Sequence, residues 1–167
     1  PPAVPAAPVT GEDLPAAKAM APTIGAAERP LGPARWNSVS TQDFYRAVLE
    51  GTPYPVRGLI GFGHNMLLAQ SDPVRGRAAL AALDFYVHAD LFMSPTAALA
   101  DIVLPIASCF EREALKIGFE VSEEAQSVAQ YRQAVVPPPG QARAHTDVIF
   151  ALARRLGLAD QFWAAAR

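Results

Sequence analysis

The feature that most constrains the fold is a strand–loop–helix–strand pattern in the middle of the chain. Residues 57–62 and 85–87 are short apolar runs that each predict a strand, and the first is expected to be buried. Between them, residues 63–65 predict a sharp loop. Asp72-Pro73, a capping acid followed by a proline at the first helical position, predicts a helix that ends at Leu83. Such a βαβ unit has parallel strands and a right-handed crossover, so we predict an α/β fold with a mostly parallel sheet.

Further elements are predicted on both sides of this unit. Ser40 places a capping hydroxyl before a helix that Gly51 ends. Its apolar face is expected to carry Phe44, Val48 and Leu49. A short helix over residues 96–100 and a third strand over residues 102–104 follow the unit.

A last helix is predicted between Thr146, its capping residue, and Gly157. Its side chains form one apolar stripe, made of Val148, Ile149, Leu152, Ala153 and Leu156. Residues 160–167 are predicted to form another helix.

The first 35 residues differ in composition from the rest of the chain. They contain eight of the sixteen prolines and show no apolar periodicity. Proline lacks a backbone donor and disfavours helix in the residue before it. We therefore predict that Pro1–Arg35 is an extended Ala/Pro-rich segment, either draped over a larger partner surface or forming a flexible tail. The α/β domain is predicted to begin at residue 36 and to occupy residues 36–167.

Charge and cysteine content exclude several classes of function. Fourteen basic and sixteen acidic residues, with no basic run, argue against a nucleic-acid partner. No apolar stretch reaches the roughly 18 residues of a membrane span. The single cysteine, Cys109, excludes an internal disulfide and a cysteine-rich metal site, and its apolar surroundings predict a buried, inert thiol.

Candidate binding residues follow the first two predicted strands. Ligands of open α/β sheets bind at the carboxyl ends of the strands, although neither end here matches a G-x-G-x-x-G motif or a P-loop. Gly61 and Gly63 would let the backbone approach a ligand closely, and Asn65 offers both a donor and an acceptor. The Asp90 carboxylate would accept two hydrogen bonds from a base such as guanine. The alternative is that Asn65 and Asp90 only cap their loops.

The sequence indicates neither a metal site nor a catalytic pair. His64, His88 and His145 lie in three separate segments, and we single out His64 because it follows a strand. Two pairs of nearby carboxylates, Glu111 with Glu113 and Glu123 with Glu124, have spacings that do not bring side chains together on a helix. We therefore predict no catalytic residue in this chain.

Several motifs, in order, resemble those of the molybdopterin oxidoreductase family, whose enzymes carry molybdenum or tungsten on bis(molybdopterin guanine dinucleotide). The resemblance covers residues 54–158. Met66 departs from it, because the family usually has a proline there. The matching positions are Gly63, Asn65, Asp90, Phe92, Thr96, Ala97, Ala100, Asp101, Val103, Leu104, Pro105 and Glu111.

The resemblance implies a Rossmann-like, doubly wound domain that is an internal fragment of a longer enzyme. The domain would hold the guanine end of a molybdopterin guanine dinucleotide, while the parent enzyme catalyses two-electron redox transfer and the chain alone is inactive. The metal ligand and an iron–sulfur cluster are expected upstream, outside this chain. The expected partners are the remaining domains of the parent and electron-transfer subunits. The cofactor-binding residues would be Gly61, Gly63, His64, Asn65, Asp90, Phe92 and Thr96.

Two other interpretations stay open from the sequence. The chain would be a stand-alone Rossmann-like binding module without catalysis, or a small nucleotide-dependent enzyme that acts by itself. The compartment also stays open, between the cytoplasm and export to the periplasm with the parent.

Overall fold

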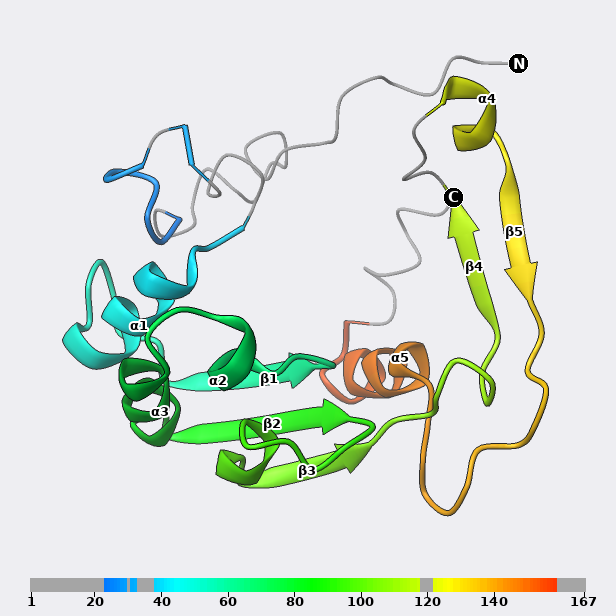
Figure 1. Cartoon of the computed structure of the whole chain (residues 1–167). Coiled ribbons are helices and arrows are strands. Elements are labelled where there is room, and N and C mark those ends of the chain that lie inside the picture. The colour runs from blue at the N-terminus through cyan, green and yellow to red at the C-terminus, as the bar shows by residue number, and fades with distance from the viewer. Residues whose placement is uncertain (1–22, 30, 33–37, 118–121, 159–167) are drawn as a thin grey trace. The chain divides into compact units, whose positions relative to one another are not determined.

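The computed structural model describes residues 23–29, 31–32, 38–117 and 122–158 (Figure 1). The chain divides into two compact units. The first comprises Pro1–Leu59 and Asn65–Tyr86, and the second comprises Ile60–His64 and Val87–Arg167. In the described parts of the chain, no helix is long and apolar enough to cross a membrane.

The main sheet has three strands in the order β1-β2-β3. They are β1 (Gly58–Phe62), β2 (Phe85–Asp90) and β3 (Ile102–Pro105). β2 and β3 pair in parallel, with Val87 opposite Ile102 and Asp90 opposite Pro105. The predicted parallel α/β fold is therefore confirmed. β2 runs three residues beyond its predicted end, because His88, Ala89 and Asp90 continue the pairing with β3.

The strands are less buried than their apolar sequences predict. In β1 only Gly61 is buried, and the Ile60 side chain is 48% exposed. Ile102 in β3 is 45% exposed. An apolar run indicates that both faces of a strand tolerate burial, but it does not report whether another layer covers them. The prediction of a buried first strand was therefore wrong for part of β1.

The first helix, α1 (Thr41–Glu50), begins and ends where the sequence predicts. The Ser40 side chain accepts a hydrogen bond from the Asp43 amide, and Gly51 takes a left-handed conformation at φ 68°. The buried face differs from the prediction, because Asp43, Tyr45 and Ala47 are the buried residues and Leu49 is 40% exposed.

The packing partner of α1 explains this face. α3 (Pro73–Ala81) contacts both α1 and α2 (Met66–Ala69), and it contains Gly76 beside Tyr45. A Cβ atom at Gly76 would lie 2.7 Å from Tyr45 Oη. The predicted helix from Asp72-Pro73 is confirmed, since Asp72 accepts from the Arg75 amide at 3.0 Å and Pro73 opens the helix. The short helix α2 was not predicted.

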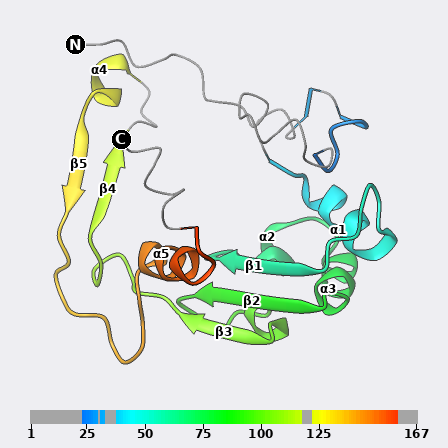
Figure 2. The same ribbon diagram turned by 180° about the vertical axis from the view of Figure 1, so that it is seen from behind.

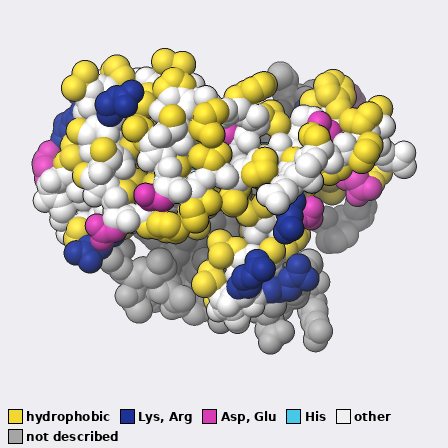
Figure 3. All heavy atoms as spheres, turned by 90° about the horizontal axis from the view of Figure 1, so that it is seen from below, with side chains coloured by type: hydrophobic (Ala, Val, Ile, Leu, Met, Phe, Trp, Pro, Cys, Tyr) yellow, Lys and Arg dark blue, Asp and Glu magenta, His cyan; other side chains and the backbone are white. Residues whose placement is uncertain are grey.

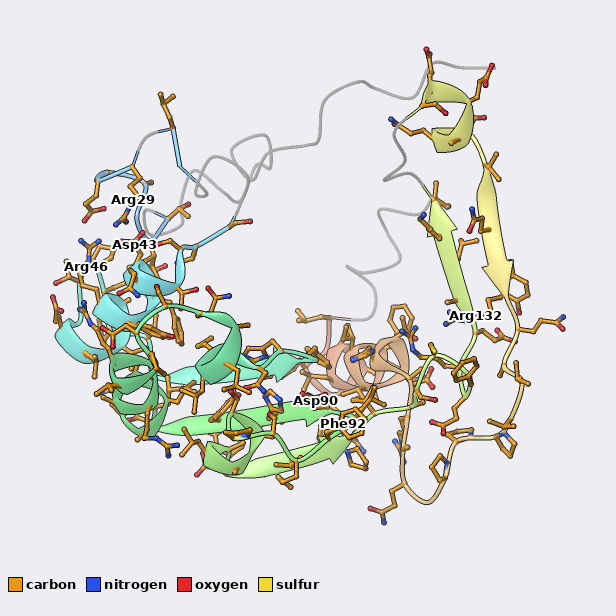
Figure 4. The ribbon with its side chains drawn as sticks, in the orientation of Figure 1. Arg29, Asp43, Arg46, Asp90, Phe92 and Arg132 are labelled. Carbon is orange, nitrogen blue, oxygen red and sulfur yellow. The ribbon has the colours of Figure 1, made fainter. Side chains whose placement is uncertain are left out.

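A turn over residues 24–28 lies inside the segment predicted to be extended. Its Ile24 side chain is only 7% exposed. Arg29 pairs with Asp43, and Glu28 pairs with Arg46 at 2.6 Å, as the labelled side chains in Figure 4 show for Arg29, Asp43 and Arg46. Ion pairs therefore join this turn to α1. The other residues of the predicted extended segment lie mostly outside the described ranges.

Asp43 is expected to stabilise this turn in a pH-dependent way. Its side chain is 5% exposed, and burial raises the pKa of its carboxyl, but hydrogen bonds from Ser40 and Arg29 and the charges of Arg29 and Arg46 together lower that pKa below its ordinary value. A lowered pKa in the folded state means that the stabilisation is full above the unfolded pKa of about 3.9. It is lost as the pH falls through the folded pKa.

Asp43→Asn is expected to speed amide hydrogen exchange in residues 24–29 and α1 by roughly 10- to 150-fold near pH 7, because a hydrogen bond to a charged group contributes about 1.5–3 kcal/mol. The difference from wild type should shrink as the pH falls below about 4. Glu50→Gln, which removes an exposed ion pair with Arg75 at the end of the same helix, is the control and should change exchange very little. Equal exchange in the wild type and Asp43→Asn at neutral pH would contradict this prediction.

The second unit also contains a two-stranded antiparallel ribbon. It is formed by β4 (Ala114–Ile117) and β5 (Ala129–Arg132), with Leu115 opposite Tyr131 and Ile117 opposite Ala129. The short helix α4 (Glu123–Gln126), capped by Ser122, precedes β5. None of these three elements was predicted, because each has only four residues and little apolar periodicity.

The last described helix is α5 (His145–Arg155). The residue at its N-cap position is Ala144, which has no side-chain cap hydrogen bond. The prediction that Thr146 caps this helix was therefore wrong, because the helix begins at His145 and Thr146 lies inside its first turn. Gly157 has φ 72° just beyond the helix, as predicted for its end. The predicted helix over residues 160–167 lies outside the described residues. Between β3 and the ribbon, the thiol of Cys109 is exposed, so the prediction of a buried thiol was also wrong.

Candidate functional site

The candidate site lies at the C-terminal ends of β1 and β2, within the second unit. The Gly63 amide, just after β1, donates to the Ala89 carbonyl of β2 at 2.8 Å. Gly63 has φ 57°, a left-handed conformation that favours glycine and turns the chain sharply after the strand. This turn brings His64 beside the end of β2.

His88 and Asp90 form the centre of the site. Side chains two residues apart on a strand point to the same face. His88 is fully buried, and its Nε2 lies 3.1 Å from Asp90 Oδ2. Asp90 Oδ1 accepts from the Leu91 amide at 2.6 Å, and the Asp90 side chain is 16% exposed. One carboxylate is therefore held at both oxygens while part of it still faces solvent.

The electrostatics of the site favour an ionised Asp90. Burial raises the pKa of the Asp90 carboxyl, but the hydrogen bonds from His88 and the Leu91 amide, with the charge of His88, bring the pKa below its ordinary value. The neighbouring His64 has a lowered pKa, first because of its burial and then because of His88, while Asp90 acts in the opposite direction. The site therefore places a carboxylate beside imidazole rings.

All three histidines of the chain come near this strand end. The His64 and His88 ring centroids are 5.0 Å apart. His145, the first residue of α5, lies with its ring centroid 5.7 Å from that of Phe62 at the end of β1, and Figures 1 and 2 show α5 beside this end of the strand. Burial and Arg112 lower the pKa of His145. Across the described ranges, no group of three or more His, Cys, Asp or Glu residues is arranged to hold a metal ion.

The remaining predicted site residues range from fully buried to largely exposed. Gly61 is buried, and a Cβ atom there would lie 2.9 Å from His64 Nδ1 and 3.3 Å from His88 Nδ1. Phe92, in the loop after Asp90, is 77% exposed (Figure 4). Thr96 is fully buried, and Asn65 occupies the N-cap position of α2.

His88 is the residue of this cluster that sequence reasoning missed. It was predicted to lie in the region of a strand end, without a role. The signal that would have found it is its spacing of two from Asp90, once β2 is known to extend through both residues.

The alternative role of Asp90 as a loop cap concerns two different sets of amides. The Ala97 amide, at the start of the η4 turn (Ala97–Leu99), donates to Ser94 Oγ at 3.1 Å rather than to Asp90. Asp90 accepts from the Leu91 amide and also interacts with the Phe92 amide, both in the loop that follows β2. Each carboxylate oxygen has two lone pairs, so these contacts leave Asp90 able to accept further hydrogen bonds.

A separate cavity of about 800 Å³ lies beside α5 in the second unit. Its charged lining is Glu111, Arg112, Glu113, Arg143, Asp147 and Arg154. Glu111 Oε2 accepts from the Ser108 amide at 2.8 Å, which gives this carboxylate a structural contact. Positive and negative side chains are mixed around the cavity, so its charge does not favour one class of ligand.

Comparisons with known proteins identify the family. The family model of molybdopterin oxidoreductases matches residues 24–155. A dopamine dehydroxylase from Eggerthella lenta is 32% identical over 116 residues, covering 70% of this chain and 11% of the relative. The acetylene hydratase of Syntrophotalea acetylenica is 32% identical over 118 residues, covering 71% of this chain and 16% of the relative. The molybdopterin-containing subunit of a thiosulfate reductase from Salmonella typhimurium is 32% identical over 126 residues, covering 72% of this chain and 16% of the relative.

A solved structure shares this fold. Acetylene hydratase from Pelobacter acetylenicus has a TM-score of 0.63 and 30% sequence identity, over 72% of this chain and 16% of that protein. The chain thus spans between 11% and 16% of the length of these relatives. The motifs along residues 54–158, the parallel sheet and the matches agree, and the chain belongs to the molybdopterin oxidoreductase family.

Proposed function

We propose that this chain supplies part of a Rossmann-like, doubly wound domain that holds the guanine end of a molybdopterin guanine dinucleotide. The observation that carries this proposal is the Asp90 carboxylate, held at both oxygens and partly exposed at the C-terminal end of β2. Ligands of open α/β sheets bind at this end of the strands. Guanine presents two adjacent donors, N1–H and its exocyclic amine, which a carboxylate accepts side by side.

The residues around Asp90 fit a nucleotide of this kind. Phe92 exposes an aromatic ring in the loop that follows Asp90, and an aromatic face is a suitable stacking surface for a base. Gly63 gives a backbone turn without a Cβ atom beside the site. Gly61 and Thr96 are buried, so they would support the site from behind rather than contact the nucleotide.

The parent protein would supply what this chain lacks. When bound, the metal and its pterin supply two-electron redox chemistry, and this chain contributes binding and orientation. The metal ligand, an iron–sulfur cluster and electron-transfer subunits are proposed to come from the rest of the parent and its partners. The relatives carry different activities in their names, from dehydroxylase to hydratase to reductase, and they match 70%, 71% and 72% of this chain. Such variety supports a cofactor-holding role for this region rather than a substrate-binding one.

The test is the base preference of the full-length protein that contains this chain, purified without cofactor. Isothermal titration with guanosine diphosphate and adenosine diphosphate should show tighter binding of the guanine nucleotide by roughly 5- to 150-fold, since one well-placed base contact contributes about 1–3 kcal/mol. Adenine lacks the adjacent donor pair. Equal affinity for the two nucleotides would argue against this function.

A further inference from the structure

We infer that His88 is a positioning residue for Asp90, and that its hydrogen bond sets the preference of the site for guanine. This inference rests on the proposed function and assigns a specificity role to a buried side chain. His88 is fully buried, so it does not touch the nucleotide itself. Its effect would pass through the contact of its Nε2 with Asp90 Oδ2 at 3.1 Å.

The proton on this hydrogen bond has a defined position. An ionised carboxylate has no hydrogen to donate, and the pKa of Asp90 lies below its ordinary value. His88 must therefore donate from Nε2, either as the Nε2–H tautomer or as the imidazolium. The Leu91 amide donates to the other oxygen at 2.6 Å. Two donors from different directions fix the plane of the carboxylate, and with it the direction of the lone pairs that remain.

The backbone beneath this pair is also fixed. His88 lies opposite Val103, and Asp90 lies opposite Pro105, in the parallel pairing of β2 with β3. Between them, the Ala89 carbonyl accepts the Gly63 amide at 2.8 Å. Both side chains therefore project from one paired stretch of β2. Because this backbone is held in place, a change in the position of the His88 ring would change the orientation of the Asp90 carboxylate.

Gly61 explains why the His88 ring stays in place. A Cβ atom at Gly61 would lie 3.3 Å from His88 Nδ1 and 2.9 Å from His64 Nδ1, closer than most Cβ contacts. The absence of a side chain at Gly61 leaves room for both rings, whose centroids are 5.0 Å apart. The two imidazoles fill that space and restrict each other. Gly61 therefore serves the histidine pair and, through it, the orientation of Asp90.

A fixed carboxylate matters for choosing between similar bases. Hypoxanthine has the N1–H of guanine but lacks the exocyclic amine, so it makes one of the two hydrogen bonds. A carboxylate held in one plane gains the second bond with guanine at little cost in ordering, whereas a rotating carboxylate loses part of that gain. The ratio of guanine to hypoxanthine affinity therefore reports the orientation of Asp90, and a purely packing role of His88 would leave this ratio unchanged.

The experiment titrates the full-length protein, purified without cofactor, with guanosine diphosphate and inosine diphosphate. His88→Phe keeps a ring and removes the donor, and His88→Gln places an amide donor near the position of Nε2. We expect His88→Phe to lower the guanosine-to-inosine affinity ratio by about 5- to 10-fold, as for the loss of one weak base contact. His88→Gln should retain most of the wild-type ratio.

The outcomes separate this inference from the proposed function. If the wild type binds guanosine diphosphate no more tightly than adenosine diphosphate, the proposed function fails. If Asp90→Asn removes the preference while His88→Phe keeps it, the function stands and the positioning role is overturned. If His88→Phe does not fold, ¹⁵N-histidine NMR of the wild type decides, because an unprotonated Nε2 on His88 would overturn the inference and a protonated Nε2 would support it.

Discussion

Asp90→Asn in the full-length protein is expected to lower its affinity for guanosine diphosphate by roughly 5- to 150-fold, the cost of a lost bidentate base contact of about 1–3 kcal/mol. The substitution is nearly isosteric. It replaces one acceptor oxygen by an NH₂ group, which would face a donor of guanine or one of the donors that now hold Asp90, such as His88 Nε2 and the Leu91 amide. The measurements are the affinity for guanosine diphosphate and the amount of cofactor in the purified protein.

A matched control separates binding from folding. Asp84→Asn changes an exposed aspartate just before β2, whose contact with Arg57 is 3.6 Å long, and should leave both cofactor content and melting temperature unchanged. If Asp90 serves only the loop beside it, Asp90→Asn should lower the melting temperature and keep full cofactor. That result would remove the main support for the proposed function.

Gly76→Ala is expected to destabilise the packing of α1 on α3 by about 1–3 kcal/mol, the usual cost of overfilling a packed core. The new Cβ atom would lie 2.7 Å from Tyr45 Oη and 3.1 Å from Tyr45 Cζ. Tyr45 is fully buried, so its ring has no open space into which it can move. The higher helix propensity of alanine offsets part of this cost. The measurement is the free energy of opening of α1 and α3 amides by hydrogen exchange.

Tyr45→Phe gives the second arm of a double-mutant cycle. Among the described residues, the buried Tyr45 Oη has no hydrogen-bond partner, so removing it should be neutral or slightly stabilising. In the Tyr45→Phe background, Gly76→Ala should recover at least half of its cost, because the closest contact is gone. Gly58→Ala, where a Cβ atom would lie an ordinary 3.6 Å from the Phe85 carbonyl oxygen, is the matched glycine control and should cost little. Additive effects in the cycle would contradict the contact.

Local signals in the sequence predicted the elements that they describe directly. Asp72-Pro73 marked the start of α3, and Ser40 and Gly51 marked the two ends of α1, because capping depends on residues only a few positions apart. The buried face of α1 was not predictable in the same way. It depends on Gly76, which is 31 positions from Tyr45 and leaves the space that a large ring fills.

In the candidate site too, local sequence signals predicted some residues, while the positions of others depend on distant packing. Asp90 and His64 were singled out because each follows a strand, and the family resemblance drawn from the motifs is confirmed by the family match. The position of His145 beside Phe62 depends on where α5 packs, which no local pattern reports. Cys109 was misplaced for a related reason. Its neighbours Ile106 and Ala107 are buried, but the chain turns outward before the thiol.

The two-stranded ribbon of β4 and β5 affects how this chain is expected to behave when it is prepared by itself. Leu115, Ile117 and Tyr131 are 63%, 61% and 58% exposed, and the register places them on one face, with Lys116 and Arg132 on the other. Apolar side chains also gather on the face of the molecule shown in Figure 3. Two strands alone are marginally stable, and open strand edges pair readily with other chains. A preparation of this region by itself is therefore prone to aggregate through the ribbon, with the two cations of the opposite face as its only local protection along β4 and β5.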